Sequence, residues 1–336
     1  MSNNYGPKIV TDGLVLCLDA ADRNSYAVQP ELVTDSNLST IGDGNFRTCF
    51  RDASSAAGLD IGPIISGKTY QIIWNVAARR ETSSASFRKD FSIISGSTNA
   101  NFGIGLKHHV FTSDQTGTLR FYPDNTGCDF DVDYASLREY QPTINDLSGN
   151  LNNGTLGNGP TFTSENYGSI IFDGTDDYVT ANFNITGSIN FTFSCWVKLD
   201  RVNVSQVVAD NSSGPSGFGI RIAGIYYSPF GYGVEGATAL VLTSSLPLNT
   251  SDWYNIVTVY TPNRIDSYIN LYHEYVTGTM SSVKEDISND MKIGTRADVF
   301  DNDFDGKISM ISVYSKALSA NEVQQNYNAT KGRFGL

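Results

Sequence analysis

Residues 191–199 read Phe-Thr-Phe-Ser-Cys-Trp-Val-Lys-Leu, and this stretch decides the fold class. Apolar side chains recur at every second position from Phe191 to Leu199, and the positions between them are mostly polar. Because successive side chains of a strand point to opposite faces, this period of two predicts a β-strand with one buried face. Similar apolar or alternating runs predict further strands at 14–18, 70–76, 128–134, 169–172, 253–260, 267–276 and 307–314.

One segment of the chain predicts a helix. Ser319 and Glu322 have the spacing of a capping box, in which each side chain bonds to the backbone of the other residue. Val323 and Tyr327 share a helix face at i, i+4. We therefore expect an all-β fold with one short C-terminal helix, at about 320–330.

The composition is that of a folded protein with short strands. Of the 336 residues, 40% are hydrophobic, which is enough to bury one or two cores and excludes disorder. Lys and Arg number 23 and Asp and Glu 35, giving a formal net charge of −12. This charge disfavours nucleic acid and anionic membranes as partners. No signal-peptide pattern and no apolar run long enough to span a bilayer occur, so we expect synthesis in a cytoplasm.

Four cysteines are present, and none forms a CxxC pair, so a zinc site is not expected. All four lie in apolar, strand-like runs. Two interpretations stay open: four buried free thiols, or a disulfide between Cys49 and Cys128.

Six segments together resemble the laminin-G-like, or concanavalin A-like, β-sandwich family. They are Asp12–Ala20, Asp146–Thr155, Phe172–Val179, Phe193–Val197, Trp253–Val257 and Asp305–Glu322. The resemblance implies a lectin-type β-sandwich jelly roll that uses both ends of the chain.

In that family the first strand leads directly to the turn Leu147-Ser148-Gly149-Asn150, but here residues 31–141 intervene. The ends of this insert, Leu32–Leu38 and Asp131–Glu139, resemble the outer strands of a carbohydrate-binding-module jelly roll. A domain whose termini lie close together can be inserted into a surface loop. We therefore expect a discontinuous sandwich, 1–30 plus 142–336, and a second β-sandwich, 31–141, inserted after its first strand.

Residues Gln325–Phe334 resemble an ending common in structural proteins of tailed phages, notably those that infect cyanobacteria. This resemblance implies a virion protein, either a head decoration or a component of a tail fibre or appendage. Its expected partners are other virion proteins, further copies of itself and host cell-surface glycans. A purely architectural role without sugar binding is the alternative.

An acidic stretch, Asp301-Asn302-Asp303-Phe304-Asp305-Gly306, opens like a calcium-binding loop. An EF-hand also needs Glu at its twelfth position, where Ser312 stands, so an EF-hand is excluded. Loop carboxylates can still gather around Ca²⁺, and the candidate ligands are Asp301, Asp303 and Asp305, with a second acidic turn at Asp173, Asp176 and Asp177.

The carbohydrate-binding-module resemblance implies a further calcium ligand, Asp133, because such modules often hold a structural Ca²⁺ with an Asp on the final strand. The alternative is that Asp129, Asp131 and Asp133 form an exposed acidic face of that strand.

A cluster of aromatic residues between Gly224 and Gly236 is the candidate carbohydrate site, expected on a loop. Aromatic rings bind sugar faces, and neighbouring polar groups bind the hydroxyls. The alternative is packing of these rings on their own domain or on another subunit. The candidates are Tyr226, Tyr227, Phe230 and Tyr232.

Glycan-cleaving enzymes with this fold use two carboxylates on one strand, which must flank the scissile bond. No such partner accompanies Glu235, Glu274 or Glu285, and the three histidines form no metal or triad spacing. We therefore expect a protein that is not an enzyme, with a polysaccharide depolymerase as the less favoured alternative.

Overall fold

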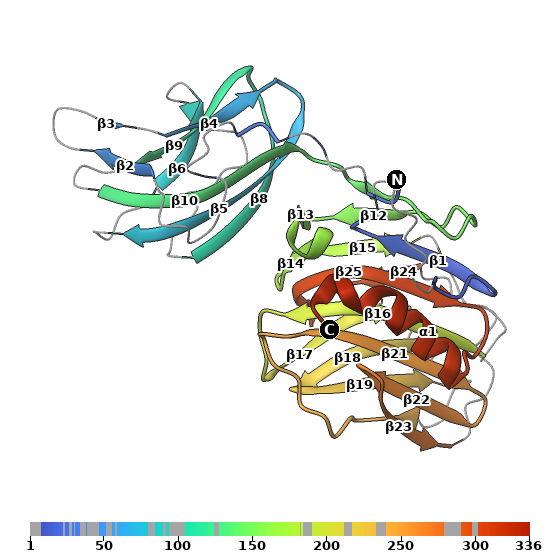
Figure 1. Ribbon diagram of the computed structural model, residues 1–336. Coiled ribbons are helices and arrows are strands. Elements are labelled where there is room, and N and C mark those ends of the chain that lie inside the picture. Colours follow the sequence, from blue (N-terminus) through green and yellow to red (C-terminus); the bar gives the residue numbers. More distant parts are fainter. Residues whose placement is uncertain are drawn as a thin grey trace. The chain divides into compact units, whose positions relative to one another are not determined.

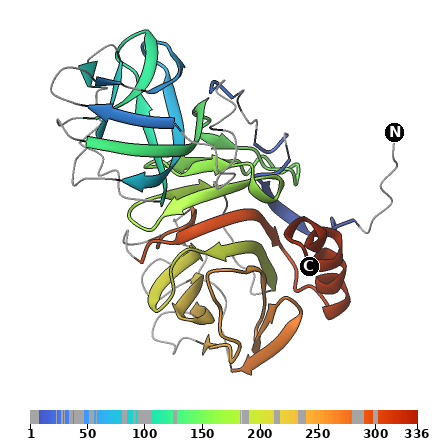
Figure 2. The same cartoon turned by 60° about the vertical axis from the view of Figure 1, so that its left-hand side comes forward.

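The structure is a computed structural model of the chain (Figures 1 and 2). It describes residues 8–22, 24–26, 29, 31–33, 38, 47–51, 56–57, 59–79, 85–89, 92–93, 105–123, 128–181, 183, 190–211, 217–232, 240–278, 290–297 and 302–336. At residues 47–51, 56–57, 78–79, 85–89, 92–93, 105–106, 122–123, 128–130 and 232 the description covers the backbone alone.

The chain divides into two compact units, and the first is discontinuous in sequence. Unit 1 comprises Met1–Ala27 and Pro142–Leu336, and unit 2 comprises Val28–Gln141. Unit 2 therefore begins three residues before the boundary at 31 that the sequence suggests.

Unit 1 contains two eight-stranded sheets among its described residues. The first sheet has the order β13-β14-β25-β16-β21-β22-β23, and β1 also pairs with β25 (Figure 1). Its strands are β1 (Leu14–Asp19), β13 (Thr161–Thr163), β14 (Ser169–Asp173), β16 (Phe191–Leu199), β21 (Trp253–Thr261), β22 (Arg264–Ile269), β23 (Tyr272–Thr277) and β25 (Asp305–Tyr314).

The second sheet of unit 1 has the order β11-β12-β15-β24-β17-β18-β19-β20. The described strand pairs in both sheets are antiparallel. The strands are β11 (Thr143–Ile144), β12 (Gly154–Gly157), β15 (Tyr178–Ala181), β17 (Val204–Asp210), β18 (Gly217–Gly224), β19 (Tyr226–Tyr232), β20 (Leu240–Val241) and β24 (Met291–Ile293).

Aromatic side chains join the two sheets of unit 1 face to face. Phe191 on β16 stacks on Tyr260 with ring centroids 4.3 Å apart, and it also meets Phe218 on β18 at 4.5 Å. Tyr227 on β19 hydrogen-bonds Thr258 on β21. All these aromatic rings are buried, so the alternating pattern of β16 does place one face in a core.

The outer face of the first sheet is covered by α1 (Ala320–Thr330) and the following 3₁₀ turn η3 (Lys331–Phe334), as Figure 1 shows. Trp196, whose side chain leaves β16 on that outer face, stacks between Tyr327 and Phe334 at centroid distances of 5.8 and 4.1 Å. Its indole N–H donates to the Thr330 hydroxyl at 2.9 Å. An all-β fold with one short C-terminal helix is confirmed.

The predicted capping box begins α1. The Ser319 side chain accepts from the Glu322 backbone N–H at 3.4 Å, and the Glu322 carboxylate accepts from the Ser319 N–H at 2.8 Å. Lys316 also donates to Glu322, and these bonds lower the pKa of that carboxyl to about 2.

Replacing Ser319 with Ala should lower the free energy of unfolding by about 1 kcal/mol, because one helix N–H loses its partner. Ser319→Asp keeps an acceptor at the same position and should stay near wild type. Urea unfolding measures both variants. Equal stability of the Ala variant and wild type would show that the cap contributes nothing.

Unit 2 also has two sheets among its described residues, with the orders β3-β2-β10-β5-β8 and β4-β9-β6-β7. Its core contains Trp74 on β5 and Phe121 on β9, whose centroids lie 5.7 Å apart. Its strands are β2 (Arg47–Arg51), β3 (Ala56–Ala57), β4 (Leu59–Ile64), β5 (Thr69–Arg79), β6 (Ala85–Lys89), β7 (Ser92–Ile93), β8 (Gly105–Thr112), β9 (Gly117–Pro123) and β10 (Cys128–Glu139).

The cysteines divide between the two units. Cys17 and Cys195 in unit 1 are free and buried. In unit 2, Cys49 lies opposite Phe130 in the β2–β10 ladder and Cys128 lies opposite Arg51, so the two cysteines are not direct cross-strand partners. Their side chains lie outside the described residues.

Candidate functional site

The acidic residues proposed as calcium ligands near residue 300 differ in their surroundings. Asp305 lies opposite Asp173 in the β14–β25 ladder and stays a predicted ligand. Asp305 begins β25, and its carboxylate lies 3.4 Å from the guanidinium of Arg201. Burial raises the pKa of Asp305, and Arg201 opposes that effect. Asp303 lies instead with the second acidic turn, and Asp301 falls outside the described residues.

Two acidic turns of unit 1 therefore meet in one cluster, which we call the acidic rim. It consists of Asp173, Asp176 and Asp177, which span the turn from β14 to β15, and Asp303, just before β25. The Asp177 carboxylate accepts from the Asp173 N–H at 3.0 Å, and the Thr175 N–H donates to Asp173 at 2.9 Å. These local bonds fix the first turn, and the β14–β25 pairing brings the second turn to it.

Asp177 is the most perturbed carboxyl of the acidic rim. Only 2% of this residue is exposed. Burial, followed by the charge of Asp173 and smaller effects of Asp176 and Asp303, raises its pKa to about 8. Burial and the same neighbours also raise the pKa of Asp176. Carboxylates held together in this way favour binding of a proton or a cation.

The residues of the rim fit a hard cation such as Ca²⁺. One carboxylate oxygen of Asp303 (Oδ1) is buried and has no hydrogen-bond partner among the described residues. A buried oxygen without a hydrogen-bond partner lowers the stability of the fold unless a ligand or an ion binds it. Carboxylate oxygens are among the ligands that Ca²⁺ prefers. The ion would be held by the four carboxylates of the rim: Asp173, Asp176, Asp177 and Asp303. In the sequence these residues belong to two separate acidic turns.

Asp133 of unit 2 has a different environment from that of an exposed acidic face. Asp131 and Asp133 are both buried on β10, so the alternative of an exposed acidic strand is wrong for these two residues. The Asn75 side-chain amide on β5 donates to Asp133 at 2.8 Å. Asp133 as a calcium ligand stays a prediction.

The candidate carbohydrate cluster forms strand β19 rather than a loop. Tyr227 is fully buried in the core, and Phe230 is buried against Gly219, where a Cβ would lie 2.2 Å from its ring. Tyr226 is 38% exposed, and the side chain of Tyr232 lies outside the described residues. An exposed platform of all four rings is therefore wrong, because alternate residues of a strand face opposite ways.

A row of neighbouring rings runs from the buried Tyr268 on β22 to the exposed His273 and Tyr275 on β23, and we call it the β23 ledge. His273 stacks on Tyr268 at 4.5 Å and lies 6.1 Å from Tyr275. The Arg264 guanidinium covers the Tyr275 ring at 3.7 Å, and Asp266 bonds both Arg264 and His273. Tyr275 is 57% exposed, but Arg264 already occupies one face of its ring.

Comparison with known protein families identifies a domain in the C-terminal half of the chain. Residues 173–324 match the family model Laminin_G_3, described as the concanavalin A-like lectin/glucanases superfamily. The chain carries a concanavalin A-like domain. The matched segment runs from the end of β14 into α1, so it includes the acidic rim, β19 and the β23 ledge. Curated protein sequences gave no match.

Several solved structures are similar to the chain, among them binding domains of botulinum neurotoxins. The serotype D binding domain is 16% identical with a TM-score of 0.44, and 55% of this chain aligns with 48% of that chain. The type G receptor-binding domain is 18% identical with a TM-score of 0.42, over 55% and 48% of the two chains. This chain spans about half the length of these structures.

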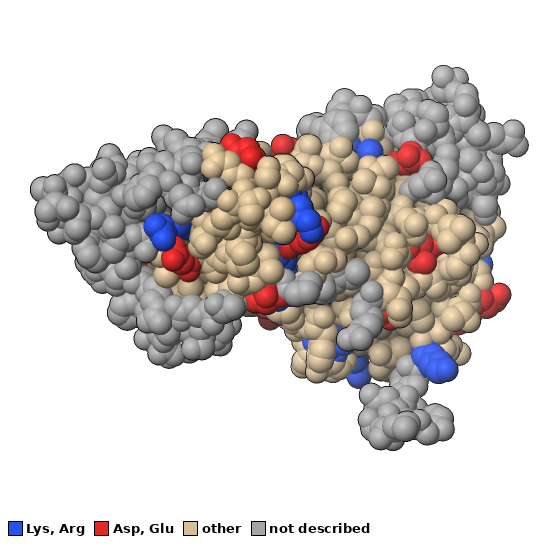
Figure 3. All heavy atoms as spheres, turned by 90° about the horizontal axis from the view of Figure 1, so that it is seen from above, with Lys and Arg blue, Asp and Glu red and all other residues tan. Residues whose placement is uncertain are grey.

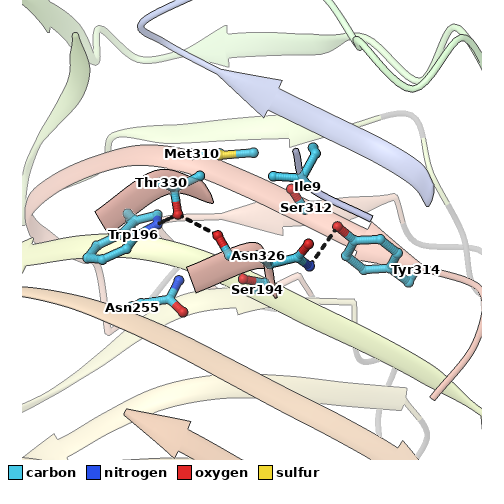
Figure 4. Close-up of a pocket in the computed structure, with 9 residues that line it drawn as sticks. All are labelled: Ile9, Ser194, Trp196, Asn255, Met310, Ser312, Tyr314, Asn326 and Thr330. Carbon is cyan, nitrogen blue, oxygen red and sulfur yellow. Dashed lines mark hydrogen bonds between the residues drawn. The ribbon is translucent and has the colours of Figure 1, made fainter. Parts of the chain in front are cut away.

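A small cavity lies beneath α1 in the concanavalin A-like domain (Figure 4). Its volume is about 10 Å³, the space of one water molecule. Its polar lining groups already bond to one another: Thr330 accepts from Trp196, and the Asn326 amide donates to the Tyr314 hydroxyl at 3.0 Å. The cavity is part of the attachment of α1 and is too small for an organic ligand.

Three Glu residues of unit 1 have described side chains, and hydrogen bonds or ion pairs hold each of them in place. Glu274 accepts from the hydroxyls of Ser244 and Ser245 at 2.6 and 2.7 Å. Glu165 pairs with Lys307 at 2.5 Å, and Glu322 pairs with Lys316 at 2.8 Å. Glu235 and Glu285 lie outside the described residues. The described Glu residues thus show no pair free to flank a glycosidic bond.

The described surface has no concentrated charge in the view of Figure 3, where acidic and basic side chains lie scattered among other residues. Within the described part of the chain, none of the helices has the length and apolar character to traverse a bilayer.

Proposed function

We propose that the protein is a structural component of a tailed-phage virion and that its concanavalin A-like domain binds host cell-surface glycans. Its place would be a head decoration or a tail fibre or appendage, with other virion proteins and further copies of itself as partners. The protein would be made in the host cytoplasm and act in the particle.

The main support for glycan binding is the concanavalin A-like domain itself, a lectin-type sandwich matched over residues 173–324. The virion part is supported by the resemblance of Gln325–Phe334 to endings common in phage structural proteins. These residues form the second half of α1 and all of η3, and the rings of Tyr327 and Phe334 pack on Trp196. In this proposal the ending completes the domain.

The proposed role is binding without catalysis. It is supported by the local bonds of Glu165, Glu274 and Glu322, which leave these carboxylates committed to neighbouring side chains. A depolymerase would need an acid and a second carboxylate on either side of the scissile bond. Release of reducing ends from host polysaccharide would support the enzyme alternative.

Calcium is proposed as a structural ion at the acidic rim. It is supported by the buried Oδ1 of Asp303, which has no hydrogen-bond partner among the described residues, and by the charges of Asp173, Asp176 and Asp303 that act on Asp177. When bound, the ion would neutralise these carboxylates and hold the β14–β15 turn against the segment before β25.

A glycan array probed with the full chain tests the binding role, and immunogold labelling of purified particles tests the location. We expect retention on a restricted set of glycans and label on every particle. Label on particles without binding to any glycan would favour the purely architectural alternative. Absence of the protein from particles would contradict the virion role.

A further inference from the structure

An open hollow in unit 1 shares no lining residue with the acidic rim, β19 or the β23 ledge, and its lining residues lie outside the matched segment 173–324. It is a shallow depression of about 290 Å³ that opens widely to solvent, and it is lined by Asp19, Ala21, Asp22, Tyr167 and Arg333. These residues come from three separate segments: the end of β1 with the turn after it, the 3₁₀ turn η2 (Glu165–Tyr167), and η3. A volume of this size is at the lower end for small-molecule sites and suits a single sugar ring.

Tyr167 is displayed in this hollow by a strained turn. Its residue is 75% exposed, the largest exposed fraction of any aromatic residue described. Asn166 and Tyr167 have φ values of 52° and 70°, a left-handed conformation that Asn tolerates but that is unfavourable for Tyr. Strain of this kind persists where the surroundings enforce it, and it concentrates at functional positions.

The surroundings do enforce the turn. The Asn166 side-chain amide donates to the Arg333 carbonyl at 3.1 Å, and the Ser309 hydroxyl donates to the Gly168 carbonyl at 2.6 Å. A Cβ on Gly168, whose φ is 145°, would lie 2.5 Å from the Ala20 carbonyl oxygen, so only glycine allows this approach. The backbone is therefore locked on both sides of Tyr167 while its ring stays unpacked.

The polar groups of the hollow are also fixed before any ligand arrives. The Arg333 guanidinium makes two bonds to the Asp19 carboxylate, at 2.9 and 3.0 Å, and a third to the Ser309 hydroxyl at 2.8 Å. Asp22 accepts two bonds from Asn24 at one carboxylate oxygen. Its other oxygen has no hydrogen bond among the described residues and can accept one from a ligand.

The chemistry of the hollow selects a neutral, hydroxyl-rich ring. An exposed tyrosine face binds the C–H face of a pyranose, and a free carboxylate oxygen accepts from a sugar hydroxyl. Among the described residues of the hollow, two carboxylates face one arginine that is already paired, and this arrangement disfavours an anion such as phosphate or a sulfated sugar. We infer that the Tyr167 hollow is the site at which this domain binds a neutral pyranose unit, an inference that rests on the proposed glycan-binding function.

The β23 ledge offers a matched control. Tyr275 is also an exposed tyrosine of the same domain, but Arg264 covers its ring at 3.7 Å. Tyr275→Ala removes the same number of atoms from the surface and should leave sugar binding within about twofold of wild type.

Calorimetric titration of the full chain with neutral trisaccharides of glucose, galactose, mannose and N-acetylglucosamine tests the inference. We expect at least one trisaccharide to bind wild type. Tyr167→Ala should weaken that affinity about tenfold or more, and Tyr167→Phe should stay close to wild type because the ring remains.

If a trisaccharide binds wild type and Tyr167→Ala with equal affinity, the site is overturned but the proposed function stands. If Tyr226→Ala then loses that affinity, the site lies on β19. Failure of every trisaccharide to bind wild type would overturn the pyranose site, while the glycan array would still decide the proposed glycan binding separately.

Discussion

Replacing Trp196 with alanine is expected to lower the free energy of unfolding by about 4 kcal/mol, since deleting a buried aromatic ring removes its contacts and leaves a cavity. Trp196 is buried and stacks on both Tyr327 of α1 and Phe334 of η3. Loss of the ring removes two stacking contacts between the outer face of the first sheet and the C-terminal segment. Thermal and urea unfolding of the full chain measure the effect.

Trp196→Phe is the matched control for that prediction. It keeps a stacked ring but loses the indole N–H that donates to Thr330 at 2.9 Å, so the expected loss is only about 1–2 kcal/mol. A loss below about 1 kcal/mol for Trp196→Ala would show that α1 and η3 are held to the sheet by other contacts.

Asp177→Asn is expected to stabilise the protein at pH 8 in EDTA by an amount on the order of 4 kcal/mol. The pKa of Asp177 is about 8 in the folded protein, against an ordinary value of 3.8. Between these values the native state holds a proton that the unfolded state has released, so wild-type stability falls as pH rises from about 4 to 8. The Asn variant has no such proton, so its advantage should vanish below about pH 4.

The same unfolding measurements at pH 8, repeated with calcium in place of EDTA, test whether the acidic rim binds the ion. If Ca²⁺ binds at the acidic rim, it should raise the stability of wild type at pH 8 by ~2.7 kcal/mol at a hundredfold excess over its Kd. The Asn variant should gain much less, because it lacks one carboxylate ligand. The exposed Asp252 provides the control as Asp252→Asn, which should behave as wild type in both arms. Unfolding that is identical in EDTA and calcium would remove calcium from the account.

The sequence predicts those features of the fold that depend on local chemistry. The alternation of Phe191–Leu199 and the spacing of Ser319 and Glu322 correspond to β16 and α1, because strand period and helix capping are properties of adjacent residues. The same alternation rule, applied to 226–232, would have separated Tyr226 from Tyr227, but the glycines on either side of that stretch suggested a loop instead.

The sites depend on contacts between distant parts of the chain, which local patterns do not reveal. Asp303 meets Asp177 because β14 pairs with β25. Tyr167 lies beside Asp19 and Arg333, which are far from it in sequence. The one local signal at Tyr167 is the Gly168 that follows it, and a single glycine in a turn does not indicate an exposed ring.

Hydroxyl-radical footprinting of the full chain, with and without polysaccharide released from the host surface, tests the central claim of glycan binding at Tyr167 most directly. Tyr167, Tyr275 and Tyr272 are 75%, 57% and 47% exposed, so all three should be oxidised in the free protein. The account predicts that polysaccharide protects Tyr167 several-fold and leaves Tyr275 and Tyr272 unchanged. Equal oxidation of Tyr167 in the two samples would contradict it.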